Sequence, residues 1–219
     1  MDRQQLSALI DHTLLKPEAT TAQVELLCAE AIEHAFASVC VSPTHVALVA
    51  RHLDDHQSMA CSVIGFPSGA HLPAIKAAEA ARAVADGAQE LDMVIDLGAL
   101  ADRGGAAVEH EVAAVRAEVA DAVAIKVIIE SAALTDDQIV AACEAAVAAG
   151  ADFVKTSTGF HPSGGASPHA VALMRRTVGD DVGVKASGGI RSYEDALAML
   201  AAGASRLGMS AGVAVVTGG

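Results

Sequence analysis

Three lysines inside strongly apolar segments are the residues of this chain whose type and spacing best suit chemistry. The chain has five lysines, and Lys126, Lys155 and Lys185 each follow a valine or an isoleucine in an apolar run. A lysine on a buried strand is costly unless it is paired or functional. The spacings of 29 and 30 residues match one strand-plus-helix unit each, so we expect the three on consecutive strands.

Lysines on neighbouring strands that face one interior would crowd their ammonium groups. Crowding and desolvation both disfavour the charged form, so we expect the pKa of at least one of the three to be lowered. A neutral amine can add to a carbonyl and form a Schiff base, which makes the cluster a candidate for covalent aldehyde chemistry. The alternative is that the lysines form ion pairs with Asp92, Asp96 and Glu130.

Two carboxylates lie in equally apolar segments and could serve the same chemistry. Asp11 stands in LIDHTLLK and Asp92 in ELDMVID. They can pair with the lysines, and a carboxylate beside a Schiff-base lysine can also relay protons, directly or through water. Glu130 follows another such segment, and we expect it to be structural.

Two glycine-containing segments, SGGIR at 187–191 and GMSAG at 208–212, directly follow expected strands. Backbone N–H groups in such loops, at the starts of helices, form a phosphate cradle in many barrels, so a phosphorylated substrate is expected. The second segment also matches the G-x-S-x-G motif of serine hydrolases. That motif needs an acidic residue and a histidine further along the chain, and the seven residues after Gly212 contain neither.

Short β-branched segments alternate with alanine-rich segments, which is typical of a parallel sheet covered by helices. The expected strands are 9–12, 38–41, 60–65, 90–95, 124–129, 153–156, 183–186 and 206–209. The expected helices are 21–35, 43–54, 72–86, 105–119, 135–149, 168–178 and 192–202. A weak repeat supports the pattern, because Gly87, Gly150 and Gly203 each end a helix directly before a strand.

Eight such units predict an α/β fold of the TIM (β/α)₈ type, a parallel eight-stranded barrel with outer helices, as a single domain over residues 1–219. The alternative is an open doubly wound sheet. Its usual G-x-G-x-x-G signature cannot occur here, since no two glycines stand two residues apart.

The composition argues against several classes of function. Acidic residues outnumber basic ones by 27 to 14, giving a formal charge of −13, so no nucleic-acid partner is expected. The four cysteines are widely separated, which favours reduced thiols. No secretory signal and no membrane-spanning run is visible, so a cytoplasmic protein is expected. His52 and His56 have the spacing of a helical metal pair, but they precede a strand at the stability end of a barrel, so no metal site is expected.

Taken in order, eight segments resemble the deoxyribose-phosphate aldolase family, and the resemblance covers essentially the whole chain. The segments are DHTLLKP (11–17), VCVSP (39–43), VIGFPSG (63–69), ELDMV (90–94), KVIIE (126–130), FVKTSTG (153–159), VKASGGIR (184–191) and RLGMS (206–210). The resemblance implies a class I, Schiff-base aldolase that reversibly cleaves 2-deoxy-D-ribose 5-phosphate to D-glyceraldehyde 3-phosphate and acetaldehyde. It also implies a cytoplasmic homodimer or higher homo-oligomer in nucleoside catabolism, with no cofactor and no metal.

The same resemblance implies roles for matching positions. Lys155 is the implied Schiff-base nucleophile, Lys185 the neighbour that lowers its pKa, and Asp92 the general acid/base working with an ordered water. The expected substrate-binding residues are Asp11, Thr13, Cys40, Lys126, Thr158, Gly188, Gly189, Gly208 and Ser210.

Two departures from the family pattern bear on the substrate rather than on the type of reaction. Some members carry a lysine where this chain has Phe160, and some carry a C-terminal tail ending in tyrosine that this sequence does not show. The rival functions are a Schiff-base aldolase for a different phosphorylated aldehyde, a phosphosugar isomerase-type barrel, and a barrel that only senses a ligand.

Overall fold

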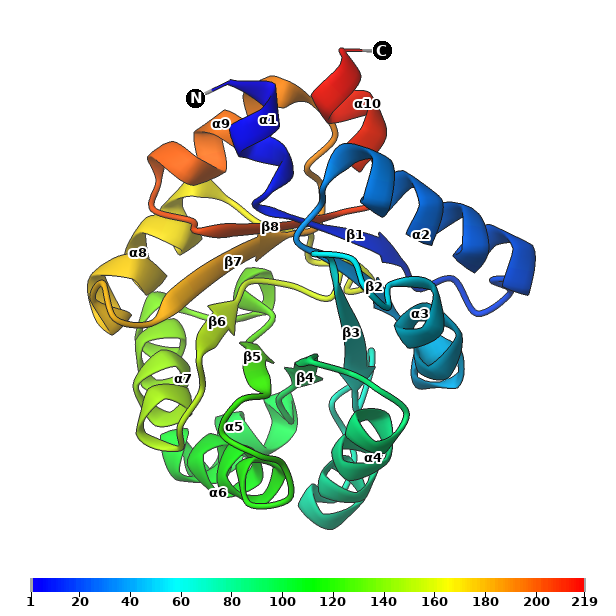
Figure 1. Cartoon of the computed structure of the whole chain (residues 1–219). Coiled ribbons are helices and arrows are strands. Elements are labelled where there is room, and N and C mark those ends of the chain that lie inside the picture. Colours follow the sequence, from blue (N-terminus) through cyan, green and yellow to red (C-terminus); the bar gives the residue numbers. More distant parts are fainter. Residues whose placement is uncertain (1, 219) are drawn as a thin grey trace.

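A closed barrel of eight parallel strands forms the centre of the molecule in the computed structural model, which describes residues 2–218 (Figure 1). Neighbouring strands pair in sequence order, and the first pairs with the last to close the barrel. The strands are β1 (Ile10–Leu14), β2 (Ser38–Val41), β3 (Met59–Ile64), β4 (Glu90–Val94), β5 (Ala124–Ile128), β6 (Phe153–Lys155), β7 (Gly183–Ser187) and β8 (Arg206–Met209). The expected (β/α)₈ barrel is confirmed, and the open sheet was the wrong alternative.

Helices surround the barrel on its outside (Figure 1). They are α1 (Arg3–Ser7), α2 (Thr21–His34), α3 (Val46–His52), α4 (Pro73–Ala85), α5 (Leu97–Arg103), α6 (Gly105–Arg116), α7 (Asp136–Ala148), α8 (Pro168–Val178), α9 (Tyr193–Ala201) and α10 (Gly212–Thr217). Two 3₁₀ turns, η1 (Pro43–His45) and η2 (Ser131–Ala133), follow β2 and β5. All eight expected strands and all seven expected helices are present, whereas α1, α5 and α10 were not foreseen.

Local sequence signals explain where the helices begin and end. Thr20 and Thr135 cap α2 and α7, each accepting a hydrogen bond from the backbone of a glutamine three residues on, which binds back in a capping box. The repeat glycines Gly87, Gly150 and Gly203 follow α4, α7 and α9 with φ of 104°, 87° and 110°. Such a φ costs glycine little, so each chain segment can turn directly into the next strand.

Alternate residues along a strand face opposite sides of the barrel wall. One side packs against the helices in the apolar core, and the other faces a charged barrel interior. On β5, Ile125 and Val127 pack into the main hydrophobic core with the surrounding helices, whereas Lys126 between them points into the barrel. The register pairs Lys126 with Asp92 and Lys155 with Lys185. Because side chains alternate between the two faces of a strand, these four share the interior of the barrel.

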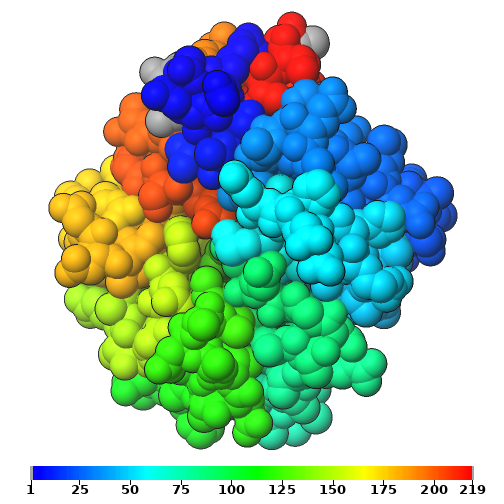
Figure 2. Space-filling view, in the orientation of Figure 1, coloured from blue at the N-terminus to red at the C-terminus, as the bar shows by residue number. Residues whose placement is uncertain are grey.

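The first and last helices, α1 and α10, lie side by side on the outside of the barrel. Figure 2 shows the dark-blue N-terminal segment beside the red C-terminal segment. The Nη1 atom of Arg3 in α1 donates to the backbone oxygen of Val215 in α10 over 2.9 Å. Within residues 2–218, the structure contains no helix of the length and apolarity needed to cross a bilayer.

Candidate active site

Asp92 on β4 is the centre of a buried polar network. Its Oδ2 accepts hydrogen bonds from Lys155 Nζ at 2.7 Å and Lys185 Nζ at 2.6 Å. Its Oδ1 accepts one from Lys126 Nζ at 2.9 Å. The three lysines lie on the consecutive strands β5, β6 and β7 and reach one carboxylate, as their spacing predicted.

Two more carboxylates and an arginine complete this network. Lys126 Nζ lies 2.6 Å from Glu90 Oε2, and Lys185 Nζ also binds Asp11. Arg206 on β8 donates to Asp11 Oδ1 at 2.7 Å and to Glu90 Oε1 at 3.2 Å. The network therefore joins four basic side chains to three carboxylates, and Glu90 and Arg206 are members that the sequence analysis missed.

The carboxylates, rather than crowding among lysines, set the pKa values in this network. Burial alone raises the pKa of Asp92, but the ammonium groups of Lys126, Lys155 and Lys185 outweigh it and hold that pKa well below its usual range. Burial alone lowers the pKa of Lys126 and Lys185, and the charges of Asp11 and Asp92 raise both above the usual value. The expected lowering is thus wrong for these two lysines, because each ammonium contacts carboxylates directly.

A cavity of about 300 Å³ opens above the network at the carboxyl ends of the strands. Of the three network lysines, only Lys155 lines it, whereas Lys126 and Lys185 are fully buried beneath. The lining residues are Thr13, Leu14, Leu15, Lys16, Lys155, Thr158, Gly159, Phe160, Ser187, Gly188, Gly189, Ile190, Arg191, Gly208, Met209 and Ser210.

The loops after β7 and β8 form one side of this cavity, where the phosphate cradle was expected. Its four expected residues all line the cavity: Gly188, Gly189, Gly208 and Ser210. The backbone is tightly packed here, since a Cβ on Gly165 would lie 2.2 Å from the backbone oxygen of Gly188. Lys16 and Arg191 also line the cavity. Sequence reasoning assigned them no role, although they supply positive charge that Phe160 does not.

Hydrogen bonds hold two threonines of the cavity wall, Thr158 to the segment after β5 and Thr13 within its own strand β1. Thr158 donates to the Glu130 carboxylate through its backbone N–H at 3.2 Å and through Oγ1 at 2.5 Å. Glu130 has a φ of 56°, a left-handed conformation that is uncommon outside glycine. Thr13 Oγ1 donates to the backbone oxygen of Asp11 at 2.8 Å. Glu130 therefore positions the loop after β6, a structural role as the sequence analysis expected.

Cys40 does not line the cavity and lies instead beside Asp92 and Cys61 in the buried interior. The Sγ atoms of Cys40 and Cys61 approach the two Asp92 oxygens at 3.9 and 3.3 Å. Among residues 2–218, these three form the one group with metal-ligand atoms close together, all within 4.8 Å. Three ammonium groups already bind the Asp92 carboxylate, so a cation there would meet electrostatic repulsion.

Three other sequence candidates lie away from the lysines. Asp96 accepts a hydrogen bond from Ala99 N at 3.0 Å and so caps α5, because the chain turns into a helix directly after β4. Glu130 binds Thr158 rather than an ammonium. The alternative of ion pairs with Asp92, Asp96 and Glu130 is therefore correct only for Asp92. His52 lies in the last turn of α3, with its Nε2 3.8 Å from Glu25.

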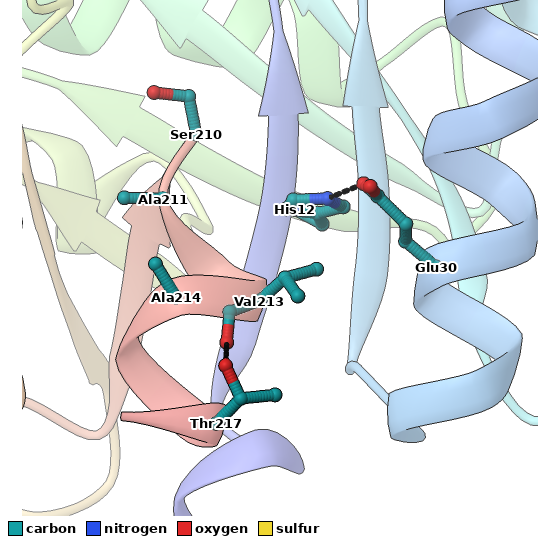
Figure 3. Close-up of a pocket in the computed structure, with 7 residues that line it drawn as sticks. All are labelled: His12, Glu30, Ser210, Ala211, Val213, Ala214 and Thr217. Atoms are coloured by element: carbon teal, nitrogen blue, oxygen red, sulfur yellow. Dashed lines mark hydrogen bonds and ion pairs between the residues drawn. The ribbon is translucent and has the colours of Figure 1, made fainter. Parts of the chain in front are cut away.

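A larger hollow of about 430 Å³ lies outside the barrel wall, between α2 and α10 (Figure 3). In it, His12 Nε2 pairs with Glu30 at 2.7 Å, and Thr217 Oγ1 donates to the backbone oxygen of Val213 (Figure 3). None of the network lysines lines this hollow, and Ser210 is the one lining residue that it shares with the cavity above Asp92. Volume alone therefore does not distinguish the two, whereas the Lys155 amine lines only the cavity above Asp92.

Comparison with known proteins places this barrel among aldolases. The model of the DeoC/LacD family aldolases matches residues 6–217. Deoxyribose-phosphate aldolase 1 of Cutibacterium acnes is 56% identical over 211 residues, which cover 96% of either chain. The deoxyribose-phosphate aldolase of Lysinibacillus sphaericus is 54% identical over 215 residues, covering 98% of this chain and 96% of the relative.

Solved structures agree with the sequence comparison. An aldolase named QR15 superposes with a TM-score of 0.92 and 38% identity, over 97% of this chain and 95% of its own. The deoxyribose phosphate aldolase of Aeropyrum pernix, described as a tetramer, superposes with a TM-score of 0.89 and 33% identity. That match covers 99% of this chain and 91% of the other.

Proposed function

Since the chain belongs to the DeoC/LacD family of aldolases, and so to the lyases, we propose that it cleaves 2-deoxy-D-ribose 5-phosphate reversibly to D-glyceraldehyde 3-phosphate and acetaldehyde. Lys155 acts as the Schiff-base nucleophile. One observation carries this assignment: among the three lysines bound to Asp92, Lys155 alone lines the cavity. A carbonyl group in the cavity can reach this amine without displacing the barrel interior.

Lys155 must lose a proton before it reacts, because an uncharged amine is the form that adds to a carbonyl. Its Nζ stands 2.7 Å from Asp92 Oδ2, and this carboxylate, working with water, can take that proton away.

The reaction follows from this arrangement with atoms and electrons in balance. The Lys155 amine adds to C1 of the open-chain sugar. The carbonyl oxygen takes one proton from the amine and one from the ordered water and leaves as water, which gives a protonated imine. The C3 hydroxyl then gives up its proton, and the C2–C3 bond breaks. Its electron pair forms an enamine, and glyceraldehyde 3-phosphate leaves. Protonation at C2 and addition of water release acetaldehyde and restore the amine.

Asp92 serves these steps as a general acid/base that works with an ordered water, because its Oδ2 stands 2.7 Å from the reacting nitrogen. The protonated imine carries the same single positive charge as the ammonium that it replaces, so Asp92 keeps an ion pair with this nitrogen in the imine steps and loses it only while the enamine is neutral. Lys185, on the same oxygen, holds the carboxylate ionised and in place. Asp11 and Lys126 complete the polar network below the imine.

The phosphate group binds at the loops after β7 and β8. Backbone N–H groups near Gly188 and Gly208 and the Ser210 hydroxyl donate to it, with Lys16 and Arg191 as the nearby cations that line the cavity. The charges of Lys16 and Arg191 compensate for the lysine that some family members carry at the position of Phe160. Thr13 and Thr158 also line the cavity and accept hydrogen bonds from the sugar hydroxyls, because their own hydroxyl hydrogens are donated to Asp11 and Glu130.

We also propose that residues 1–219 form one catalytic domain, that the protein is a homo-oligomer, and that it acts in the cytoplasm. The tetramer described for the Aeropyrum pernix relative supports the second of these proposals.

The test is cleavage of deoxyribose 5-phosphate, measured as acetaldehyde release, with fructose 1,6-bisphosphate as the comparison substrate. The Lys155→Met variant is expected to lose at least about 10³-fold in kcat, as removal of a nucleophile does. Activity of Lys155→Met close to wild type would contradict the proposal. Cleavage of the fructose phosphate alone would indicate a different Schiff-base aldolase, and isomerisation without C–C cleavage an isomerase-type barrel.

A further inference from the structure

A second, smaller cavity lies against the catalytic cavity and shares one wall with it. It has a volume of about 150 Å³ and is lined by residues at or after the carboxyl ends of β3, β4, β5 and β6. The catalytic cavity is lined from β6, β7, β8 and β1. The two linings have only Thr158 and Phe160 in common. The loop after β6 therefore separates the two cavities.

The two residues of this wall differ in how firmly they are held. Thr158 is fixed through its backbone N–H and hydroxyl to Glu130. Phe160 is 49% exposed, and within residues 2–218 its one aromatic contact is the edge-on ring of Phe66, with centroids 5.3 Å apart. Gly159, directly before it, has a φ of 83°. The backbone N–H of Phe160 is bound to Thr158 Oγ1, but its half-exposed ring can turn outward about its own side-chain torsions while Thr158 stays in place.

The size and lining of the smaller cavity suit an apolar group. A cavity of about 150 Å³ lined by apolar side chains is large enough to hold benzene. Pro67, Val94 and Pro162 supply apolar walls, and the Glu130 carboxylate in the lining is already bound by Thr158. Ser68 and His161 also line it, but no lysine or arginine does, in contrast to the catalytic cavity. A phosphate would find no permanently charged cation here, whereas a phenyl or short alkyl group would lose contact with water.

We propose that the smaller cavity is a subsite for the apolar end of an unphosphorylated acceptor aldehyde, and that Phe160 is its gate. This inference rests on the proposed aldolase function, in which the acceptor carbonyl stands beside the acetaldehyde enamine of Lys155. The enamine carbon bonds to the carbonyl carbon, the carbonyl oxygen takes a proton to become a hydroxyl, and water releases the product. A phosphorylated acceptor extends toward the β7 and β8 loops, whereas an apolar acceptor extends past Phe160 toward β3, β4 and β5.

The test compares two acceptors, 3-phenylpropanal and propanal, each with acetaldehyde as donor. Ser68 is exposed and lines only the smaller cavity, so Ser68→Phe fills this cavity from the far side, with Ser68→Ala as matched control. Ser68→Phe is expected to lower kcat/KM for 3-phenylpropanal relative to propanal by roughly tenfold or more, as loss of apolar burial of a ring implies. Phe160→Ala opens the gate and is expected to raise the same ratio by about tenfold.

Cleavage of deoxyribose 5-phosphate by each variant is measured in parallel, and Ser68→Phe is expected to stay within about twofold of wild type because its position does not line the catalytic cavity. If neither variant changes the ratio of kcat/KM for 3-phenylpropanal to that for propanal, while deoxyribose 5-phosphate is still cleaved, the subsite proposal is overturned and the aldolase proposal stands. A Ser68→Phe variant that loses both acceptors equally would also overturn it. Failure of the wild-type protein to cleave deoxyribose 5-phosphate would overturn the aldolase proposal itself, and the subsite with it.

Discussion

Asp92→Asn is expected to destabilise the barrel much more than Lys126→Met, although both side chains are fully buried and each binds three oppositely charged groups. The difference lies in what each change leaves behind. Without the Asp92 charge, Lys126 keeps Glu90 and Lys185 keeps Asp11. Lys155 loses its carboxylate partner, and the structure gives it no other within residues 2–218.

The size of the effect follows from the distances. The Nζ atoms of Lys155 and Lys185 both lie within 3 Å of Asp92 Oδ2, so they are no more than about 5 Å apart. At an effective dielectric constant of about 20, two unit charges at that separation repel by about 3 kcal/mol. Together with the unpaired buried charge, we expect Asp92→Asn to cost about 3 to 5 kcal/mol of unfolding free energy at neutral pH.

Lys126→Met is milder because every carboxylate keeps a cation. Asp92 keeps Lys155 and Lys185, and Arg206 still binds both Asp11 and Glu90. The network then has as many basic groups as carboxylates, and methionine fills much of the volume of the lysine stem. We expect a loss of only about 1 to 2 kcal/mol.

Urea unfolding of the wild type and both variants at neutral pH measures these costs, provided that the m-values agree. A difference of about 2 kcal/mol or more between the variants, with Asp92→Asn the less stable, is the expected result. Equal losses, or a greater loss in Lys126→Met, would refute the reasoning, since both variants lose a similar number of contacts and differ in the charge that remains.

Three further changes test neighbouring parts of the structure. Lys76→Met leaves the buried Glu111 carboxylate without its ammonium and is expected to cost about 3 to 5 kcal/mol in urea unfolding. Adding Glu111→Leu should recover most of that loss, and no recovery would contradict pairing as the cause. Gly165→Ala places a Cβ 2.2 Å from the Gly188 oxygen, so KM for deoxyribose 5-phosphate should rise about tenfold. An unchanged KM in steady-state kinetics would show that the β7 loop does not bind the phosphate. The folded-state pKa of Asp92 lies well below its unfolded value of about 3.9, so its contribution to stability is full above about pH 4 and is lost as the pH falls further. A urea midpoint that is level from pH 6 down to pH 3 would contradict this.

Much of the fold could be predicted from the sequence because local signals agree with one another. β-Branched runs mark the strands, and glycines after α4, α7 and α9 mark three of the turns into them. The helices that escaped prediction have five to seven residues, too few to show a helical period. The capping box formed by Asp2 and Gln5 is the only local sequence signal that indicates α1.

The sequence predicts which side chains point into the barrel, because side chains alternate along a strand. It does not predict which of them meet across the interior, because that depends on how the barrel closes. The spacing of Lys126, Lys155 and Lys185 was enough to predict that all three lie in the barrel interior, where they bind Asp92. Glu90 and Arg206 stand at the first residues of β4 and β8, positions that look solvent-facing in the sequence. They meet because the closed barrel brings their side chains together across its interior. The pKa values of the lysines depend on those partners, so the expectation from crowding could not give their direction.

The most direct test of the central claim is borohydride reduction in the presence of acetaldehyde, followed by mass spectrometry of the peptides. Reduction converts an imine into a stable secondary amine, so the ethylated lysine identifies the nucleophile. Ethylation of the peptide that contains Lys155, absent in Lys155→Met, is the expected result. Ethylation of Lys126 or Lys185 instead, or of no lysine, would contradict the assignment of the cavity-facing amine as the reactive group.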